Sequence, residues 1–90
     1  MEEQSSILEE VFSSRGRVKV LRVLVKFKEL NISEVARKAN LSHTAVERHL
    51  EKLKQLKLVT EKKFGRIRIF RFNSKNPIAE AIKDLFEKFG

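Results

Sequence analysis

Two short helical stretches separated by a three-residue break constrain the fold of this chain more than any other feature of its sequence. The first stretch, "ISEVARKA", offers Ser33 as its N-terminal cap. Asn40 opens the break, where its short polar side chain lets the backbone adopt a left-handed conformation. Ser42 can cap the second stretch, which runs to about Lys57. The sequence therefore predicts two helices joined by a tight turn.

The segment "SSRGRVKVLRVLVKFK" carries two conflicting patterns. Its β-branched residues and the alternation over residues 18–20 favour a strand. Its charged side chains, however, recur at i, i+4, i+7 and i+11, which marks one side of a helix. These side chains are Arg15, Lys19, Arg22 and Lys26. Because Ser13 or Ser14 can also act as a cap, we interpret the segment as a helix.

The remaining segments predict a helix at each end of the chain and a β-hairpin. One helix covers residues 5–12, and the other is capped by Asn76 and begins at Pro77. The run "LVTEKKFGRIRIFRFN" alternates around its central Phe-Gly pair, as a hairpin with a basic tip does. We expect a single domain over residues 1–90, mainly α with a small β-hairpin (α+β), in the order helix–helix–helix–helix–strand–strand–helix. Two helices joined by a tight turn and followed by a basic hairpin form a winged helix-turn-helix.

The positive charge of the chain is concentrated in its middle. The sequence has 20 basic and 12 acidic side chains, a net charge of +8. Residues 15–41 and residues 42–71 each carry +6, whereas residues 1–14 carry −4 and residues 72–90 are neutral. A polyanion is the partner that this distribution favours. The absence of cysteine excludes disulfides, thiolate metal sites and cysteine nucleophiles.

The helix that begins near Ser42 has one apolar and one polar face. With ~100° of rotation per residue, Val46 and Leu50 fall on a buried seam and the opposite face is polar. Its side chains match base edges and phosphates in the major groove of DNA, which admits one helix. Arg48 suits a guanine or a phosphate, and Lys52 suits a phosphate. A solvated helix surface is the alternative interpretation. The residues expected to contact DNA are Ser42, His43, Thr44, Glu47, Arg48, Lys52 and Gln55.

The two histidines of this helix do not predict a metal site. His43 and His49 are six residues apart and point about 120° apart, so they cannot share an ion as an i, i+4 pair does. His49 flanks the buried seam and is expected to pack there with a hydrogen bond, while His43 either contacts DNA or covers the helix end. Ser42 has a capping role and no base to activate it. We therefore expect no enzymatic activity, no metal and no cofactor.

Three stretches carry a resemblance to a known family: "ISEVARKANLSHTAVERHLEKLKQLKLV", "FGRIRIFRFN" and "NPIAEAIKDLF". From Arg17 to Leu85, about three-quarters of the chain, the sequence resembles the ArsR-like winged helix-turn-helix transcription regulators, especially archaeal ones. The resemblance implies that the helix from Ser42 reads the major groove and that the hairpin reaches the flanking backbone or the minor groove. The hairpin residues that it assigns to DNA are Lys62, Lys63, Arg66 and Arg68.

Three departures from the family pattern affect these expectations. Lys57 stands where the family has a glycine, so either the helix ends by another route or Lys57 bears left-handed strain of ~1–2 kcal/mol. Glu47 replaces a small hydroxyl residue. It either accepts from a cytosine amino group or, as we favour, pairs with Arg48 or Lys54. The last helix has neither Cys nor His at the positions that sense metals in the family, which argues against metal sensing.

Both terminal helices carry apolar stripes, and the family resemblance implies that they pair two subunits. The stripes either cover the core of a monomer or, as we expect, form the interface of a homodimer over residues 1–13 and 77–90. The expected interface residues are Ile7, Leu8, Val11, Phe12, Ile78, Ile82, Leu85, Phe86 and Phe89. The hairpin also carries two apolar side chains, Ile67 and Ile69, that contact with DNA does not explain. One option is that they pack against the last helix.

The sequence thus predicts a sequence-specific regulator of transcription that binds double-stranded DNA as a homodimer. Because it lacks a signal-peptide layout and any apolar run of ~20 residues, we expect a cytoplasmic, nucleoid-associated protein without a membrane partner. Two alternatives are a non-specific architectural DNA-binding protein and a winged-helix module that binds other proteins.

Overall fold

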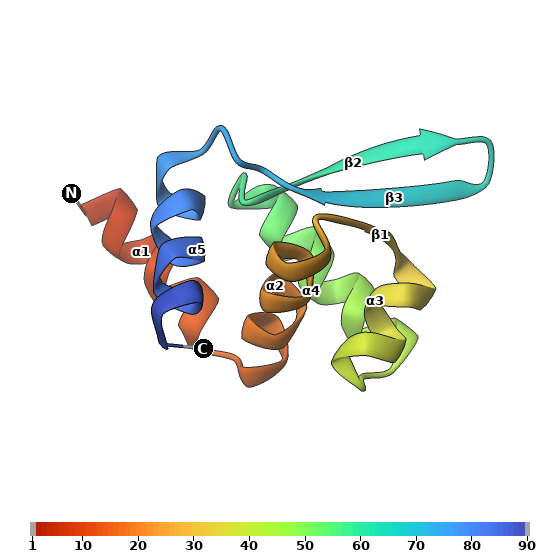
Figure 1. The fold of residues 1–90 in the computed structure, drawn as a ribbon, viewed down its shortest axis with the longest axis horizontal. Coiled ribbons are helices and arrows are strands. Elements are labelled where there is room, and N and C mark those ends of the chain that lie inside the picture. The colour runs from red at the N-terminus through yellow and green to blue at the C-terminus, as the bar shows by residue number, and fades with distance from the viewer. Residues whose placement is uncertain (1, 90) are drawn as a thin grey trace.

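The chain folds into helices and a small antiparallel sheet, from which a long hairpin projects (Figure 1). The computed structural model describes residues 2–89, with side chains from residue 6 onward. The elements are α1 (Glu2–Phe12), α2 (Arg15–Phe27), β1 (Glu29–Asn31), α3 (Ile32–Ala39), α4 (His43–Gln55), β2 (Val59–Phe64), β3 (Ile67–Phe72) and α5 (Pro77–Phe89). The predicted mainly α fold with a small hairpin is confirmed. Within residues 2–89, the helices are too short or too polar to cross a lipid bilayer.

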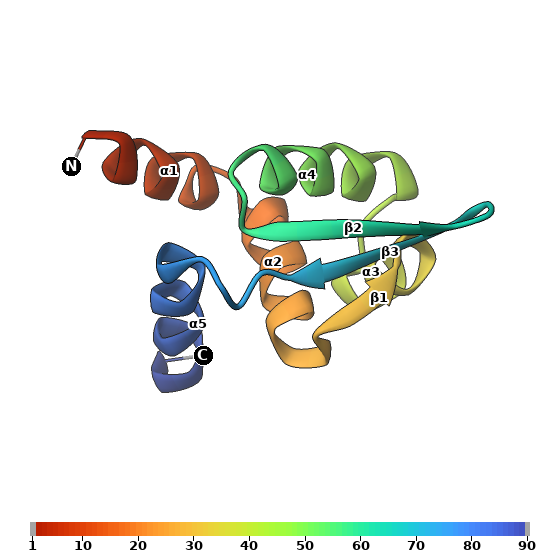
Figure 2. The ribbon, with the colours of Figure 1, turned by 90° about the horizontal axis from the view of Figure 1, so that it is seen from above.

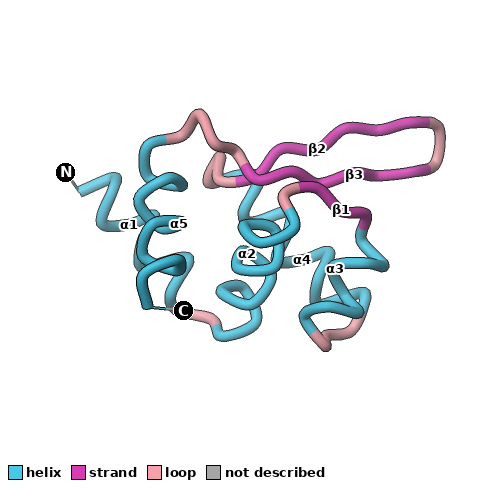
Figure 3. The backbone as a smooth tube through the Cα atoms, in the orientation of Figure 1, coloured by secondary structure: helices cyan, strands magenta, loops and turns pink. Residues whose placement is uncertain are grey.

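β1 is an element that the sequence does not predict. The segment Glu29–Asn31 is expected to be an extended link, but it pairs antiparallel with β3, and the strand order is β1-β3-β2 (Figure 3). Leu30 lies opposite Phe70 in this register, and both side chains are buried. A strand of three residues is too short to show alternation in a sequence. Its pairing ties the base of the hairpin to the start of α3.

Local caps define the two helices on either side of the turn. Asn31, not Ser33 as predicted, caps α3: its Oδ1 accepts from the Glu34 N–H at 2.8 Å, and the Glu34 carboxylate accepts from the Asn31 N–H at 3.0 Å. This reciprocal capping box leaves Ser33 exposed within the first turn. Asn40 ends α3 in the predicted left-handed conformation, with φ 56° and ψ 51°. Ser42 caps α4 as predicted, and its Oγ accepts a backbone N–H at 3.1 Å.

The C-terminal end of α4 is built around a left-handed lysine. Of the two alternatives for Lys57, the structure shows the strained one, with φ 64°, just after the helix stops. The Leu58 N–H donates to the Leu53 carbonyl at 3.0 Å, which is the outer hydrogen bond of a Schellman motif. The side-chain amides of Asn73 and Asn76 donate to the Lys57 carbonyl at 2.8 and 2.9 Å. These bonds hold the strained residue and direct the chain into β2.

α2 is the central helix of the molecule and contacts each of the other four helices described (Figure 2). Its side chains Val20, Leu21 and Leu24 are fully buried. On α4, Val46 and Leu50 are also fully buried, as the helical spacing predicts. Because this seam of α4 packs against α2, the opposite, polar face of α4 must point away from the core.

The terminal helices belong partly to the core. Val11 is 0% exposed, Ile82 2% and Phe86 8%, so their own chain already covers them. The prediction that these three side chains contact a second copy is therefore wrong. Ile7 and Ile78 are partly buried against the same core. The four remaining residues of the predicted interface are exposed: Leu8, Phe12, Leu85 and Phe89.

Candidate nucleic-acid interface

The outer face of α4 is polar and open to solvent. Thr44, Arg48 and Gln55 are exposed and point away from the buried seam, as predicted. Ser42 and His43, at the start of the helix, are also exposed. A shallow groove runs along this face. It is lined by Arg17, Thr44, Glu47, Arg48, Glu51, Lys52, Gln55 and Arg68. The sequence analysis missed Arg17, because helical spacing within α2 does not show which other helix lies beside it.

One end of this face is in contact with α1. The Lys52 Nζ lies 3.7 Å from the Glu10 carboxylate, so Lys52, which is predicted to contact a phosphate, already has an acidic neighbour. The Arg17 guanidinium lies 3.5 Å from the same carboxylate and also donates to the Glu10 carbonyl. The Lys52 side chain keeps 38% of its surface exposed. An exposed ion pair of this kind is weak, so Lys52 can exchange Glu10 for a phosphate.

The hairpin of β2 and β3, which we call the wing, ends in a tight turn with a basic tip. Gly65 has φ 60° at the first central position of this turn, as a type II′ hairpin requires. Lys62, Lys63 and Arg66 are exposed, so the structure leaves them accessible as predicted. Phe64 is also exposed at the tip, opposite Ile67 in the register. The sequence pattern assigns no role to Phe64 and offers for Ile67 only packing against the last helix.

Arg68 is not free, although the sequence predicts that it contacts DNA. Its guanidinium donates to the carboxylates of Glu47 at 2.7 Å, Glu51 at 3.1 Å and Glu61 at 2.6 Å. Lys54 joins the same group, with its Nζ 2.6 Å from Glu61 and 3.4 Å from Glu51. These five residues, which we call the Arg68 cluster, link α4 to the wing. Glu47 is therefore paired, but the predicted partners, Arg48 and Lys54, are wrong: its partner is Arg68, 21 positions away in the sequence.

The buried member of the Arg68 cluster is Glu61, whose side chain is only 6% exposed. Hydrogen bonds from Arg68 and Lys54 outweigh the cost of burial and lower the pKa of Glu61 from 4.5 to about 2. The same hydrogen bonds raise the pKa of Lys54 and of Arg68. All these groups are charged at neutral pH, so the ionic link between α4 and the wing is complete under those conditions.

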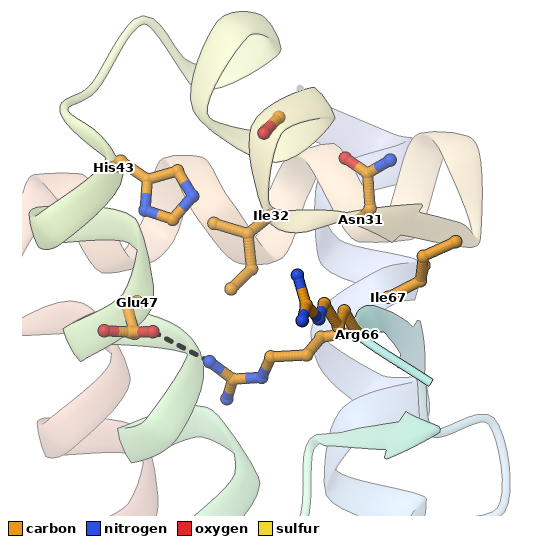
Figure 4. Close-up of a pocket in the computed structure, with 8 residues that line it drawn as sticks. Asn31, Ile32, His43, Glu47, Arg66 and Ile67 are labelled. Carbon is orange, nitrogen blue, oxygen red and sulfur yellow. Dashed lines mark hydrogen bonds and ion pairs between the residues drawn. The ribbon is translucent and has the colours of Figure 1, made fainter. Parts of the chain in front are cut away.

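A hollow of about 320 Å³ lies between the wing, α3 and the start of α4. In Figure 4, His43 from α4, Ile32 from the start of α3 and Arg66 from the wing surround it. Ile67 lines the same hollow as Asn31 and Ile32 and is 55% exposed, so it faces the start of α3 rather than the last helix. His43 and Arg66, which are far apart in the sequence, thus line the same hollow.

His49 is buried at 8% exposure, as predicted, but it is also expected to form a hydrogen bond, and its buried Nδ1 has no partner among the described residues. Its ring packs against Gly16 so closely that a Cβ added there would lie 2.7 Å from the His49 Nε2. Burial lowers the pKa of His49, and the charges of Arg17 and Arg48 lower it further. Within residues 2–89, groups of three or more His, Cys, Asp or Glu side chains suited to a metal ion do not occur.

The lowered pKa of His49 predicts that acid destabilises the fold. The unfolded chain binds a proton near the ordinary pKa of 6.5, whereas folded His49 binds it only at lower pH. The free energy of unfolding in urea should therefore fall as the pH is lowered from 7.5 to 5.5. We expect the slope of the unfolding free energy against pH to be smaller in His49→Gln and unchanged in His43→Gln, which alters an exposed histidine. Equal slopes in the wild type and in His49→Gln would contradict the prediction.

The sequence model of the family described as "Bacterial regulatory protein, arsR family" matches residues 14–61, slightly more than half of the chain. The match covers α2, β1, α3, α4 and the first residues of β2. A search of curated proteins by sequence found no match.

Three solved structures with similar folds cover nearly the whole chain. The transcriptional regulator HlyU from Vibrio vulnificus is 26% identical, with a TM-score of 0.78 over 96% of this chain and 88% of that one. The transcriptional repressor PagR of Bacillus anthracis is 26% identical, with a TM-score of 0.76 over 93% of this chain and 92% of that one. NolR from Sinorhizobium fredii is 25% identical, with a TM-score of 0.78 over 99% of this chain and 87% of that one.

Proposed function

The chain belongs to the arsR family of bacterial regulatory proteins and is a DNA-binding transcription regulator, and we propose that it reads a specific sequence of double-stranded DNA with α4 in the major groove. The observation that carries this proposal is the joint exposure of Thr44, Arg48 and Gln55 on the outer face of α4, beside a basic wing. Arginine and glutamine side chains can each form two hydrogen bonds with a base edge in the major groove.

The wing supplies contacts that position the protein. In this proposal, Lys62, Lys63 and Arg66 approach phosphates or the adjacent minor groove. His43 and Ser42, at the start of α4, lie where recognition helices touch bases and the backbone. Lys52 assists at the other end of the helix after it leaves Glu10. Arg68 has another role, because its donors are used within the Arg68 cluster.

Selection of bound duplexes from a random pool tests this function. The selected duplex and a scrambled one are then titrated at 50 mM and 200 mM salt. We propose a preferred site with two related halves and an affinity for random DNA that falls steeply with salt. Equal affinity for both duplexes would indicate an architectural DNA-binding protein, and absence of binding even at low salt would indicate a module that binds other proteins.

A homodimer is the second part of the proposal. Residues 1–90 would form a single domain in which α1 and α5 pair two copies through Leu8, Phe12, Leu85 and Phe89, since these large apolar side chains are exposed. Residues 72–90 have no net charge, so electrostatic repulsion at such an interface is low. Two copies related by a two-fold axis would place their α4 helices about 34 Å apart and read half-sites about 10–10.5 base pairs apart.

We expect Leu85→Glu to weaken self-association roughly tenfold or more, because a carboxylate would lose its hydration in the apolar interface. Sedimentation equilibrium of the full chain measures the change. Asp84→Ala is the matched control, because Asp84 is exposed and points about 160° away from the buried Ile82. A wild type that stays monomeric at high micromolar concentration would contradict the dimer.

We propose that the protein acts at the nucleoid, where the DNA that it regulates lies. We also propose that it is an archaeal member of the family, on the resemblance carried by residues 17–85. Finally, its action is steric, without catalysis or a cofactor: the bound protein blocks or recruits the transcription machinery.

A further inference from the structure

Glu47 is an acidic residue on the surface that the proposed function places against DNA. It lies on the side of α4 that faces the wing, lines the same groove as Thr44 and Arg48, and has a side chain that is 48% exposed. A carboxylate there repels phosphates, so a protein that bound only the backbone would gain affinity by losing it. Its presence on this face requires an explanation from its contacts.

Arg68 holds the Glu47 carboxylate in one orientation. The Arg68 Nη1 donates to the Glu47 Oε2 at 2.7 Å, the bond drawn as a dashed line in Figure 4. Arg68 is itself fixed by Glu61, which accepts from its Nε at 2.6 Å and is nearly buried in the wing. The wing therefore determines where the Glu47 carboxylate lies.

The second carboxylate oxygen of Glu47 is left available. Among the described residues, only the Oε2 of Glu47 accepts a hydrogen bond, so Oε1 keeps its full capacity to accept another. In the major groove, cytosine presents an amino donor, N4, to a carboxylate, whereas adenine presents its N6 amino group beside the N7 acceptor, which a carboxylate repels. Thymine presents a carbonyl oxygen at the same place, which a carboxylate repels.

We infer that Glu47 is a specificity-determining residue that accepts a hydrogen bond from the N4 amino group of a cytosine, and that Arg68 is the residue that positions it. This inference rests on the proposed function, because it requires α4 in the major groove. It also gives Arg68 its role: the guanidinium neutralises part of the carboxylate charge and prevents Glu47 from turning away from the base.

Glu51 provides a matched control one helical turn away. Its side chain is 47% exposed and also pairs with Arg68, at 3.1 Å. The Oε2 of Glu51 additionally accepts from Lys54 at 3.4 Å, so Glu51 is more fully neutralised within the Arg68 cluster. Glu47→Gln and Glu51→Gln therefore each remove one negative charge from the same cluster, one helical turn apart on α4.

The experiment measures binding of the wild type, Glu47→Gln, Glu47→Ala and Glu51→Gln to the selected duplex and to the three single-base variants at each position. For the wild type, we expect one position where cytosine is preferred over thymine about tenfold. Glu47→Ala should lose this preference yet bind random DNA more tightly, and Glu47→Gln should shift it toward adenine. Glu51→Gln should leave the preference unchanged.

The inference and the proposed function fail in different ways. If the wild type binds no duplex specifically, the proposed function is wrong. If the wild type is specific but both Glu47 variants change the affinity for all duplexes by the same factor, the function stands and the inference is overturned.

Arg68→Gln adds a further readout: a positioning role predicts loss of the cytosine preference, whereas retention of that preference in a folded variant would remove Arg68 from the inference.

Discussion

Replacing Arg48 with alanine is expected to weaken binding to the preferred DNA sequence by about 1–3 kcal/mol, or roughly 5- to 150-fold. Arg48 is exposed at the middle of the outer face of α4, where a guanidinium can reach both acceptors of a guanine. Because the loss concerns one base, the variant should also relax the preference at one position of the site. Fluorescence anisotropy with the selected duplex and its single-base variants measures both effects.

Lys63→Ala is the matched comparison for Arg48→Ala. Lys63 is exposed near the tip of the wing, where we assign it to a phosphate. Its loss should weaken binding to all sequences alike and lower the slope of log affinity against log salt by about one unit. If Arg48→Ala also weakened specific and random DNA by the same factor, Arg48 would have no base-reading role.

Replacing Glu61 with glutamine is expected to lower the free energy of unfolding at pH 7 by about 2 kcal/mol. The variant leaves the Arg68 and Lys54 cations beside a neutral amide at a site where the Glu61 side chain is only 6% exposed. The pH dependence of the free energy of unfolding should change as well. Since the folded-state pKa of Glu61 is lowered to about 2, its contribution is present above pH 4.5 and is lost as the pH falls toward 2. When unfolding in urea is measured between pH 7 and pH 2, the free energy of unfolding should therefore fall less steeply with pH in the variant than in the wild type.

Glu29→Gln serves as the control for this prediction. Glu29 pairs with Arg71 across β1 and β3 at 3.6 Å, but both side chains are more than half exposed, at 52% and 62%. Such a pair contributes little, so the variant should stay within about 0.5 kcal/mol of the wild type. If Glu61→Gln were as stable as Glu29→Gln at pH 7, the Arg68 cluster would not stabilise the attachment of the wing.

The parts of the site that sequence analysis predicted correctly depend on local geometry. Ser42 and Asn40 act through their own backbone neighbours, so their residue types predict a cap and a turn. The outward orientation of Thr44 and Arg48 follows from the position of the apolar seam on the same helix.

The parts that were missed depend on contacts between distant segments. Arg68 meets Glu47 and Glu61 only after the wing has folded against α4, so the alternating pattern of the hairpin shows a basic residue but not its partners. β1 exists because β3 pairs with it. Val11 and Phe86 belong to apolar stripes that look alike in the sequence whether a core or a second copy covers them.

Titration of the ¹⁵N-labelled full chain with the selected duplex locates the DNA-contact surface residue by residue, because amide chemical shifts change where a partner binds. We expect the largest shifts in α4 from His43 to Gln55 and in the wing from Lys62 to Arg66, with small shifts in α5. Changes confined to α1 and α5, with α4 unaffected, would show that this protein does not bind DNA through the surface assigned to it.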